Sequence, residues 1–537
     1  MVGQDEDRRP AAAALEDPQV RQNRLRAQVE IIRVALPDAV AYSGKSDDLG
    51  DTEYIYRRGV LLVRDTDLPR VRDALGDRSD AVADSIIGGV TAYHPPGGNV
   101  QAALTVLDAR LGVGVATPDH VLWITPASCC PATEPLPPGG QDPDPGISTD
   151  PDCTGEGVRV CVVDTGLDLG LVALQPWLQG VTGDPEVVNP AALGHYTGHG
   201  TFVAGVVRAM APKAEVIVKG FLPNGGAVYE SAIAAKLDSA MDEMPDIISL
   251  SAGCTTRYNL NLMGFEVFYE NRLRFYKGTV LVAAAGNDGN RGPFWPATFP
   301  WTISVGALDQ TGVRANFSNF GSWVDVYARG VDMVNAYPVG TYAYTEPPNV
   351  GLTFTSAGLA SWSGTSFATP LVAGLIAARM SKTGESAQHA AEALLRIANR
   401  QARALVRSSS RETGVHQRAA AAAAAARGPR ATPPRNVVCH LRPPLTSFAA
   451  RSSATPSAGR RWSNASPPCC GRWPASCDWT LRTRRMRCRP AGCGCSSSWT
   501  RSRTRSTSEA GWRQPCVGRA FARSPASGGS GPGASRR

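Results

Sequence analysis

The stretch "GTSFATPLVAG", which runs from Gly364 to Gly374, places a small hydroxyl residue, Ser366, directly ahead of a run with helical character. Pro370 follows about one turn later, where a proline is tolerated because the N–H that it lacks would have no intrahelical partner. Serine is also a frequent helix cap, because its side-chain oxygen accepts a backbone N–H. Taken alone, the stretch is equally compatible with a helix start and with a nucleophilic serine.

Apolar strands and amphipathic helices alternate from Gly157 onward. The run "VRVCVVD" at 158–164 is continuously apolar, which is typical of a strand buried on both faces. Further strands are expected at 215–221, 246–251, 279–286 and 302–308. After His199, apolar residues recur with the spacing of one helix face, at Val203, Val206, Val207 and Met210. This alternation predicts an α/β domain with a mostly parallel, doubly wound sheet and helices on both faces.

Three polar residues accompany Ser366 at strand ends and helix starts of this domain. Asp164 ends a buried strand, at the edge where open α/β sheets bind ligands. His199 begins a helix between two glycines, and Asn287 follows the strand at 279–286. Each has an ordinary alternative: Asp164 could be a turn residue after a strand, His199 a packed histidine, and Asn287 part of a turn. Their joint order favours nucleophilic catalysis, because a serine needs a base, a group that orients the base, and oxyanion donors.

Five stretches together resemble the subtilisin-like serine proteases, or subtilases: "VVDTGLD", "GHGTFVAG", "LSAGC", "AAAGNDG" and "GTSFATPLVAG". The resemblance covers residues 157–380. The chain order Asp, His, Ser is that of subtilisin, whereas chymotrypsin-like and α/β-hydrolase enzymes use other orders. Sedolisins have a glutamate in place of this histidine, so the intact "GHGT" favours subtilisin.

The resemblance implies a serine endopeptidase that hydrolyses peptide bonds through an acyl-enzyme intermediate. Ser366 would be the nucleophile, His199 the general base and then acid, and Asp164 the group that orients the imidazole. Asn287 and the Ser366 backbone N–H would form the oxyanion hole. Two short segments would bind the substrate backbone: Ser251, Ala252 and Gly253, and Ala284, Ala285 and Gly286.

The sequence departs from many subtilases at Phe202, where they have a second histidine; we expect a packing difference only. His195 and His199 are four residues apart, but the segment between them lacks a metal-binding helix motif, so no metal site is expected. No cofactor is expected for the chemistry. Subtilases often bind structural calcium, but no calcium ligands can be assigned from this sequence.

We expect five regions along the chain. The region at 51–126, in which a strand and a helix are followed by a helix and a strand, resembles subtilase propeptides. The alternative is a permanently attached regulatory domain. The regions are an N-terminal extension (1–50), a small α+β pro-domain-like unit (51–126), a Pro/Gly-rich linker (127–156), the catalytic domain (157–410) and a tail (411–537).

The tail differs sharply in composition from the rest. Residues 1–410 hold 32 Lys and Arg against 44 Asp and Glu, whereas the tail holds 23 Arg, no Lys and 3 acidic residues. Its Ala, Pro, Gly, Ser and Arg content, with scattered Cys and Trp, predicts either a disordered Arg-rich segment or GC-rich DNA read out of frame. Nucleic-acid binding through these arginines is a weaker hypothesis, because no binding module is recognisable.

No secretory signal or membrane-spanning run is recognisable, so we expect a cytoplasmic protein; a wrongly assigned start would make it secreted. We expect polypeptide substrates and no membrane partner, whereas the oligomeric state is not readable from the sequence. The alternative function is a catalytically silent binding protein on a subtilase scaffold, which the four intact catalytic positions disfavour.

Overall fold

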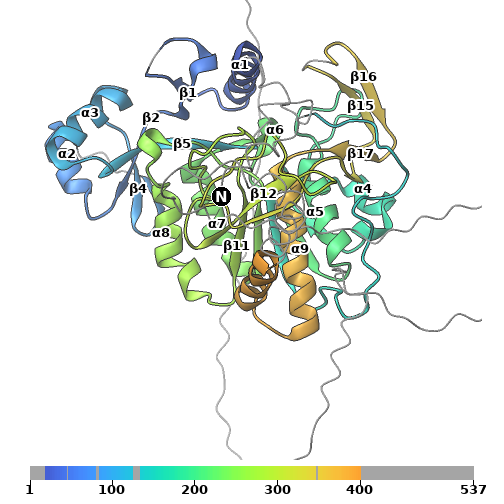
Figure 1. The fold of residues 1–537 in the computed structure, drawn as a ribbon. Coiled ribbons are helices and arrows are strands. Elements are labelled where there is room, and N and C mark those ends of the chain that lie inside the picture. Colours follow the sequence, from blue (N-terminus) through green and yellow to red (C-terminus); the bar gives the residue numbers. More distant parts are fainter. Residues whose placement is uncertain (1–17, 45, 80–83, 125–133, 346–348, 401–537) are drawn as a thin grey trace, which may run out of the picture. The chain divides into compact units, whose positions relative to one another are not determined.

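The computed structural model describes residues 18–44, 46–79, 84–124, 134–345 and 349–400 (Figure 1). The tail predicted at 411–537 and the last ten residues of the predicted catalytic domain lie outside the described residues.

Among the described residues, seven parallel strands form the central sheet, in the order β13-β12-β11-β10-β6-β8-β7. The strands expected from apolar runs are all present in it. Their bounds are β6 Arg159–Asp164, β7 Thr182–Gly183, β8 Glu215–Gly220, β10 Ile247–Leu250, β11 Val280–Ala284, β12 Thr302–Leu308 and β13 Val326–Arg329. The two central neighbours β6 and β10 each lie between other strands, which explains why most of their residues are apolar.

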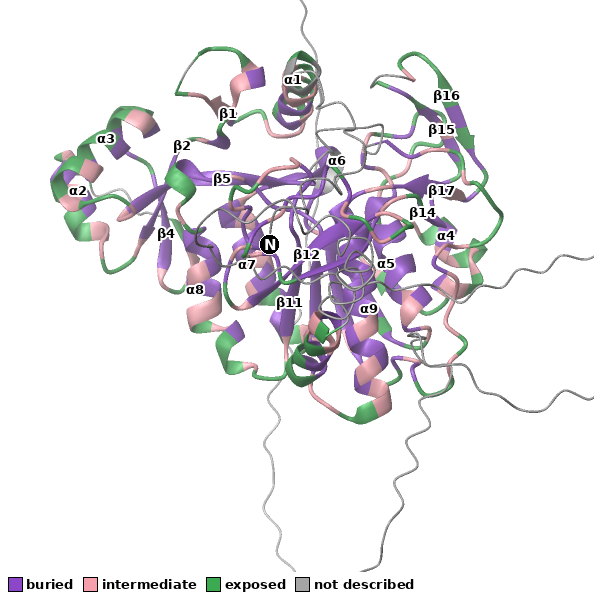
Figure 2. Cartoon of the chain, viewed as in Figure 1, coloured by how far each residue is buried: buried purple, intermediate pink, exposed green. Residues whose placement is uncertain are grey.

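Successive side chains of β6 point into different cores on the two faces of this sheet. Val160 and Val162 pack in one core with α5 and α9, whereas Cys161 and Val163 pack in a second core with α7 and α8. Figure 2 shows the central strands β11 and β12 buried along their length. The doubly wound α/β fold expected from the sequence is confirmed. The helices are α4 Leu169–Leu174, α5 His199–Met210, α7 Glu230–Ala240, α8 Met263–Asn271 and α9 Thr365–Thr383.

A second, antiparallel sheet is built mostly from the N-terminal region, and it extends into the catalytic domain. Its strand order is β3-β4-β2-β5-β9, with β1 paired to β2. Helices α2 and α3 pack on it around Leu61, Val63 and Leu104. The elements are β1 Ala39–Tyr42, β2 Tyr54–Arg64, α2 Leu68–Leu75, β3 Asp84–Ile87, β4 Val90–Tyr93, α3 Val100–Leu111, β5 Ala116–Trp123 and β9 Ala227–Tyr229. Because β1 precedes residue 51, the sheet begins earlier than the expected unit boundary.

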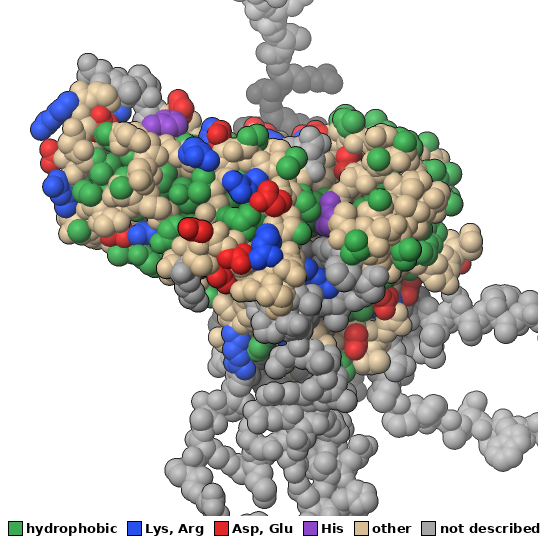
Figure 3. Space-filling view, turned by 90° about the horizontal axis from the view of Figure 1, so that it is seen from above, with side chains coloured by type: hydrophobic (Ala, Val, Ile, Leu, Met, Phe, Trp, Pro, Cys, Tyr) green, Lys and Arg blue, Asp and Glu red, His purple; other side chains and the backbone are tan. Residues whose placement is uncertain are grey.

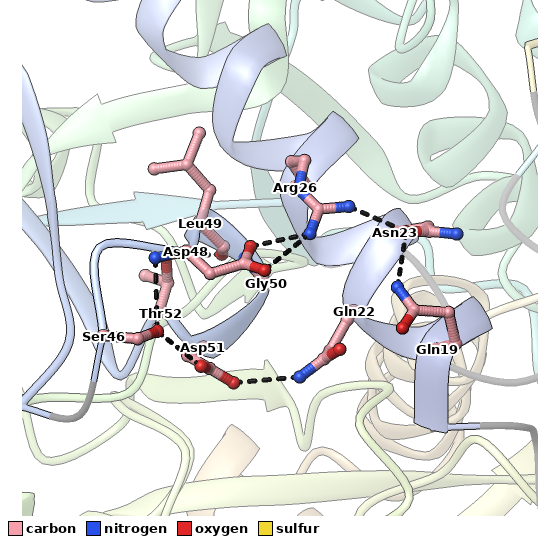
Figure 4. A network of polar contacts seen from close by, with 10 residues as sticks. All are labelled: Gln19, Gln22, Asn23, Arg26, Ser46, Asp48, Leu49, Gly50, Asp51 and Thr52. Atoms are coloured by element: carbon pink, nitrogen blue, oxygen red, sulfur yellow. Dashed lines mark hydrogen bonds and ion pairs between the residues drawn. The ribbon is translucent and has the colours of Figure 1, made fainter.

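Helix α1 (Pro18–Ala35) is tied to the loop before β2 by side-chain hydrogen bonds (Figure 4). Arg26 donates to both Asp48 oxygens at 2.7 and 2.8 Å, and Gln22 donates to Asp51 at 3.0 Å. Val29 and Ile32 of the same helix are buried in the core that contains the end of β5. The described part of the predicted N-terminal extension is therefore a packed element of this unit.

Within the predicted linker, residues 134–156 are held along the catalytic domain. Leu136 and Ser361 exchange backbone hydrogen bonds, the Ser148 N–H donates to the Ala209 carbonyl, and Asp144 accepts from the Arg329 guanidinium. These contacts use backbone groups and charges, so a Pro/Gly-rich sequence without apolar periodicity can make them. Residues 127–133 of the predicted linker lie outside the described residues.

Most of the remaining described elements are short. They are the hairpin strands β14 Met333–Ala336, β15 Gly340–Ala343, β16 Thr353–Ser356 and β17 Leu359–Trp362, helix α6 Pro223–Gly226, and the single turns Leu49–Asp51, Pro96–Gly98, Pro176–Leu178, Met241–Glu243, Arg257–Asn259 and Leu273–Phe275. A longer helix follows α9 at residues 387–400. No helix in the described ranges is long and apolar enough to cross a membrane.

Candidate active site

Asp164 and His199 form a buried hydrogen-bonded pair. Asp164 is the last residue of β6, His199 is the first of α5, and the distance from His199 Nδ1 to Asp164 Oδ1 is 2.7 Å. Both side chains are almost fully buried. The same Asp164 oxygen accepts the N–H of Thr165 at 2.8 Å, which fixes the carboxylate against its own backbone. With Nδ1 occupied, Nε2 is the ring nitrogen of His199 that remains to take up a proton.

Close backbone packing allows the start of α5 to reach the end of β6. Gly198 has a φ of 81°, and a Cβ on it would lie 2.1 Å from the ring of Pro338. A Cβ on Gly200 would lie 2.5 Å from the carbonyl oxygen of Gly166. The two glycines that flank His199 are therefore required by contact and by backbone conformation.

Aromatic side chains surround the imidazole of His199. Its ring centroid is 5.3 Å from that of Trp362, with the rings nearly perpendicular, and 5.2 Å from that of Phe367. Phe202, one turn further along α5, packs on both of these rings at 5.9 and 4.7 Å. The residue that replaces the second histidine of many subtilases thus supports the aromatic wall behind His199.

Ser366 is the second residue of α9 and is buried at the start of the helix. The helix cap position belongs to Gly364, which has no side chain to offer, so Ser366 is not the capping residue. Its hydroxyl donates to the carbonyl of Ser251 at 3.4 Å, and the Ser251 hydroxyl donates to the carbonyl of Ser366 at 2.9 Å. This reciprocal contact joins the start of α9 to the segment after β10.

Asn287 has its amide oxygen committed to the neighbouring residue Thr365. Its Oδ1 accepts the Thr365 N–H at 2.9 Å and the Thr365 hydroxyl at 2.8 Å. The amide nitrogen is consequently the side that can donate, and a Cβ built on Gly364 would lie 3.5 Å from it. Asn287 is thus held beside the start of α9, with its amide nitrogen next to Gly364.

The two predicted substrate-binding segments extend neighbouring strands. Ser251, Ala252 and Gly253 follow β10, and the other segment, Ala284, Ala285 and Gly286, ends β11, which pairs with β10. A Cβ on Gly253 would lie 2.3 Å from the Phe294 ring, and Gly286 has a φ of 91°. Small residues are needed here because larger ones would meet the surrounding backbone and rings.

Strand β5 lies against one of these segments. The Trp123 N–H donates to the Gly253 carbonyl at 3.0 Å, and the Gly253 N–H donates to the Trp123 carbonyl at 3.1 Å. On its other edge β5 pairs antiparallel with β9, with Leu122 opposite Val228, and the Ile124 N–H donates to the Gly226 carbonyl at 2.8 Å. The end of β5 therefore lies as a middle strand between two segments of the catalytic domain.

A buried polar network accompanies this pairing. Asp119 accepts the N–H and the hydroxyl of Ser231 at 2.9 and 2.7 Å, at the start of α7. His120 Nδ1 lies 3.2 Å from Glu230 Oε2, and Glu230 Oε1 accepts the Gly264 N–H at 2.7 Å. Burial raises the pKa of Glu230 to about 8 and that of Asp119 to about 6, and it lowers the pKa of His120 to about 3. No local sequence pattern indicates this network, because its two halves are more than one hundred residues apart.

Glu186, a half-buried residue in the loop before α5, is a further functional candidate that was not expected from the sequence. Its two carboxylate oxygens lie 3.1 and 3.0 Å from the Gly198 backbone nitrogen. Burial, with a smaller contribution from the charge of Asp164, raises the pKa of Glu186 to about 8. No periodicity marks a single loop carboxylate, so the sequence contains no signal for it.

Two other kinds of binding site would serve metal ions and charged partners. No group of three or more His, Cys, Asp or Glu side chains there is arranged to hold a metal ion. On the face shown in Figure 3, basic and acidic side chains are interspersed, and they form no extended patch of one sign.

The subtilase family description matches residues 155–423, and the chain belongs to this family. It is a subtilisin-like serine endopeptidase, a hydrolase that acts on polypeptides.

Its similarity to individual proteins is moderate. It is 34% identical over 258 residues to thermitase of Thermoactinomyces vulgaris, an alignment that covers 46% of this chain and 82% of thermitase. It is 35% identical over 235 residues to the thermophilic serine proteinase of Bacillus sp. (strain AK1), covering 41% of this chain and 51% of that protein. Among solved structures, fervidolysin from Fervidobacterium pennivorans matches with 22% identity and a TM-score of 0.41, covering 61% of this chain and 55% of that one.

Proposed function

We propose that this endopeptidase cleaves peptide bonds with Ser366 as nucleophile, His199 as general base and Asp164 as the group that orients the imidazole. The observation that carries the proposal is the 2.7 Å contact between His199 Nδ1 and Asp164 Oδ1, because it leaves Nε2 as the basic nitrogen. Ser366 Oγ attacks the carbonyl carbon of the substrate while His199 Nε2 takes its proton. The buried Asp164 carboxylate stabilises the imidazolium, which then protonates the leaving amine. A water molecule, deprotonated by His199 in the same way, then attacks the acyl carbon and releases the acyl group from Ser366.

The oxyanion of the tetrahedral intermediate would be bound by Asn287 Nδ2 and the backbone N–H of Ser366. Support comes from the Thr365 contacts, which turn the amide oxygen of Asn287 away from that task. The N-terminus of α9, a helix of 19 residues, adds a positive potential at the same place.

The alternative, a catalytically silent binding protein, is tested by labelling. A fluorophosphonate probe should modify Ser366, identified by peptide mapping, and Ser366→Ala should abolish both labelling and peptide hydrolysis while the melting temperature stays close to that of the parent. In subtilisin, loss of the serine lowers the rate about 10⁶-fold. The assignment would be refuted if Ser366 stayed unlabelled after the N-terminal unit had been removed by cleavage. Substantial hydrolysis by Ser366→Ala would refute it as well.

For the N-terminal unit we propose that the end of β5 blocks the substrate groove until the unit is cut away. An extended peptide added to a sheet edge is a common mode of recognition, and the end of β5 has that geometry between β9 and Gly253. Because it runs antiparallel to the segment from Ser251 to Gly253, it heads toward Ser251, whose carbonyl contacts the Ser366 hydroxyl.

N-terminal sequencing of active enzyme separates a pro-domain from a permanent regulatory domain. A pro-domain predicts a new N-terminus after Ile124 and before Leu136, because Ile124 is bound in the groove and Leu136 is hydrogen-bonded to the catalytic domain. Fully active enzyme that still begins near Met1 would show that the unit is a permanent domain.

We propose no cofactor for the chemistry, since every step above uses protein groups. Structural calcium is common in the family, and dialysis against a chelator followed by thermal melting tests for it in this chain. A fall in melting temperature that added calcium reverses would show such a site.

A further inference from the structure

The backbone N–H groups on either side of His199 are both connected to one carboxylate. The Gly198 N–H points at both oxygens of Glu186, at 3.1 and 3.0 Å. The Gly200 N–H donates to the hydroxyl oxygen of Thr165 at 3.1 Å, and the Thr165 side chain in turn hydrogen-bonds Glu186. His199 is thus flanked by two hydrogen bonds that lead, directly or through one hydroxyl, to the same side chain.

The same loop is joined to the segment that carries Asp164. The Glu186 N–H donates to the Leu167 carbonyl at 2.9 Å, and the Leu167 N–H donates to the Asp184 carbonyl at 2.9 Å. Thr165 contributes a further link, because its N–H donates to Asp164 Oδ1 at 2.8 Å. The loop from Asp184 to Glu186 is therefore bound to the exit of β6 on one side and to the start of α5 on the other.

We propose that Glu186 is a positioning residue, which holds the imidazole of His199 and the carboxylate of Asp164 in the geometry needed for proton transfer. This proposal rests on the assignment of His199 as general base. The hydrogen bonds at Gly198 and Gly200 fix the backbone on both sides of the histidine, whereas the aromatic wall confines only its ring. A base displaced by a fraction of an ångström transfers the proton from serine poorly, while substrate binding to the strand edges is unaffected.

The charge state of Glu186 gives the role a distinctive pH dependence. The titratable groups that face it are Asp164 at the end of β6, Asp168 from the segment after β6, and Tyr337 from the segment after β14. Burial and the negative charge of Asp164 keep Glu186 largely protonated at pH 7, and it ionises as the pH rises through about 8. The ionised carboxylate then adds a second negative charge near the imidazolium that forms during catalysis, so kcat should rise further in the alkaline range.

The test compares Glu186→Ala and Glu186→Gln with the matched control Asp184→Asn. Asp184 lies on the same loop but is exposed and accepts the Gly220 N–H, so its replacement removes a carboxylate that does not face His199. Enzyme freed of its N-terminal unit is quantified by end-point fluorophosphonate labelling, and kcat and KM are measured per labelled site from pH 6 to 10. Melting temperatures are recorded for each variant.

Glu186→Ala is expected to lower kcat roughly 10- to 100-fold with KM within about twofold of the parent. Glu186→Gln, which keeps an acceptor for the Gly198 N–H, should restore most of kcat at pH 7 but lack the alkaline rise, leaving it roughly three- to tenfold below the parent at pH 9.5. Asp184→Asn should match the parent throughout.

A parent-like kcat for Glu186→Ala, or a pH profile for Glu186→Gln that follows the parent, would overturn the positioning role. If Glu186→Ala fails to fold, the profile of Glu186→Gln decides. Failure of the underlying function is distinguishable, because Ser366 of the parent enzyme would then remain unlabelled.

Discussion

Trp123 and Gly253 exchange two backbone hydrogen bonds, of 3.0 and 3.1 Å, between the N-terminal unit and the segment beside Ser366. A protein substrate that added a strand to the same segment would need the same backbone groups of Gly253. On the proposed substrate-binding role of this segment, the N-terminal unit and a substrate would compete for one edge, and the strength of this strand pairing should control the access of ligands to Ser366.

Weakening the pairing should expose the active site. Trp123→Pro removes the N–H that donates to Gly253, and proline is poorly tolerated inside a paired strand. We expect fluorophosphonate labelling of Ser366 in the uncut chain to accelerate about three- to tenfold, the effect of losing roughly one hydrogen bond. Arg110→Ala is the control, because Arg110 bonds to the Ala74 carbonyl within the N-terminal unit. Equal labelling rates for Trp123→Pro and the parent would show that β5 does not limit access.

Docking of the N-terminal unit should weaken as the pH rises from about 6.5 to 8. Burial raises the pKa of Glu230 to about 8 in the docked state, so its protonated form stabilises docking, and this contribution is lost as Glu230 ionises. Asp119, with a pKa raised to about 6, acts in the same direction at lower pH, while His120, with a pKa lowered to about 3, opposes it below pH 6.5. Of these three groups, Glu230 is therefore the one whose ionisation governs docking across most of the range from pH 6.5 to 8.

Hydrogen exchange at the Trp123 amide, measured in Ser366→Ala to prevent self-cleavage and corrected for intrinsic rates, reports the docking free energy. Protection should fall by up to about tenfold for each unit of pH in this window. Glu230→Gln keeps an acceptor for Gly264 but cannot ionise, and its protection should be nearly independent of pH there. Protection that rises with pH in the parent would contradict the direction predicted.

Asn287→Ala should reduce kcat by about 10²–10³ with little change in KM, because one oxyanion donor is removed. The variant should also lose stability, by about 1–3 kcal/mol, since the buried Thr365 N–H and hydroxyl lose their acceptor. Steady-state kinetics and denaturant unfolding measure the two effects separately. A loss of stability with unchanged kcat would assign Asn287 a purely structural role.

Truncation after Ser410 should leave the melting temperature and the peptidase activity unchanged. The reason is compositional: the 23 arginines of residues 411–537 come without lysine and nearly without acidic residues, and no apolar periodicity is present to offset the entropy of ordering the chain. A marked fall in either property would show that the tail packs on the catalytic domain. Resequencing the gene near this position would then distinguish a true tail from a frameshift.

The sequence by itself determined the catalytic domain to a large extent. Apolar runs such as 160–163 identify strands buried on both faces, because few polar residues are tolerated in such strands. The helix after His199 shows its apolar spacing directly. The candidate catalytic residues could be proposed because Asp164, His199 and Ser366 each stand at the boundary of such an element, and the surrounding motifs resemble those of subtilases.

Only the tertiary structure decided how β5 meets β9 and Gly253, how Asp119 reaches Ser231, and how Glu186 reaches Gly198. Local sequence patterns report periodicity within one element, whereas these contacts join segments far apart in the chain or lie in loops without periodicity. The burial that raises the pKa values of Glu186 and Glu230 arises in the same way, because desolvation of a carboxylate depends on every segment packed around it.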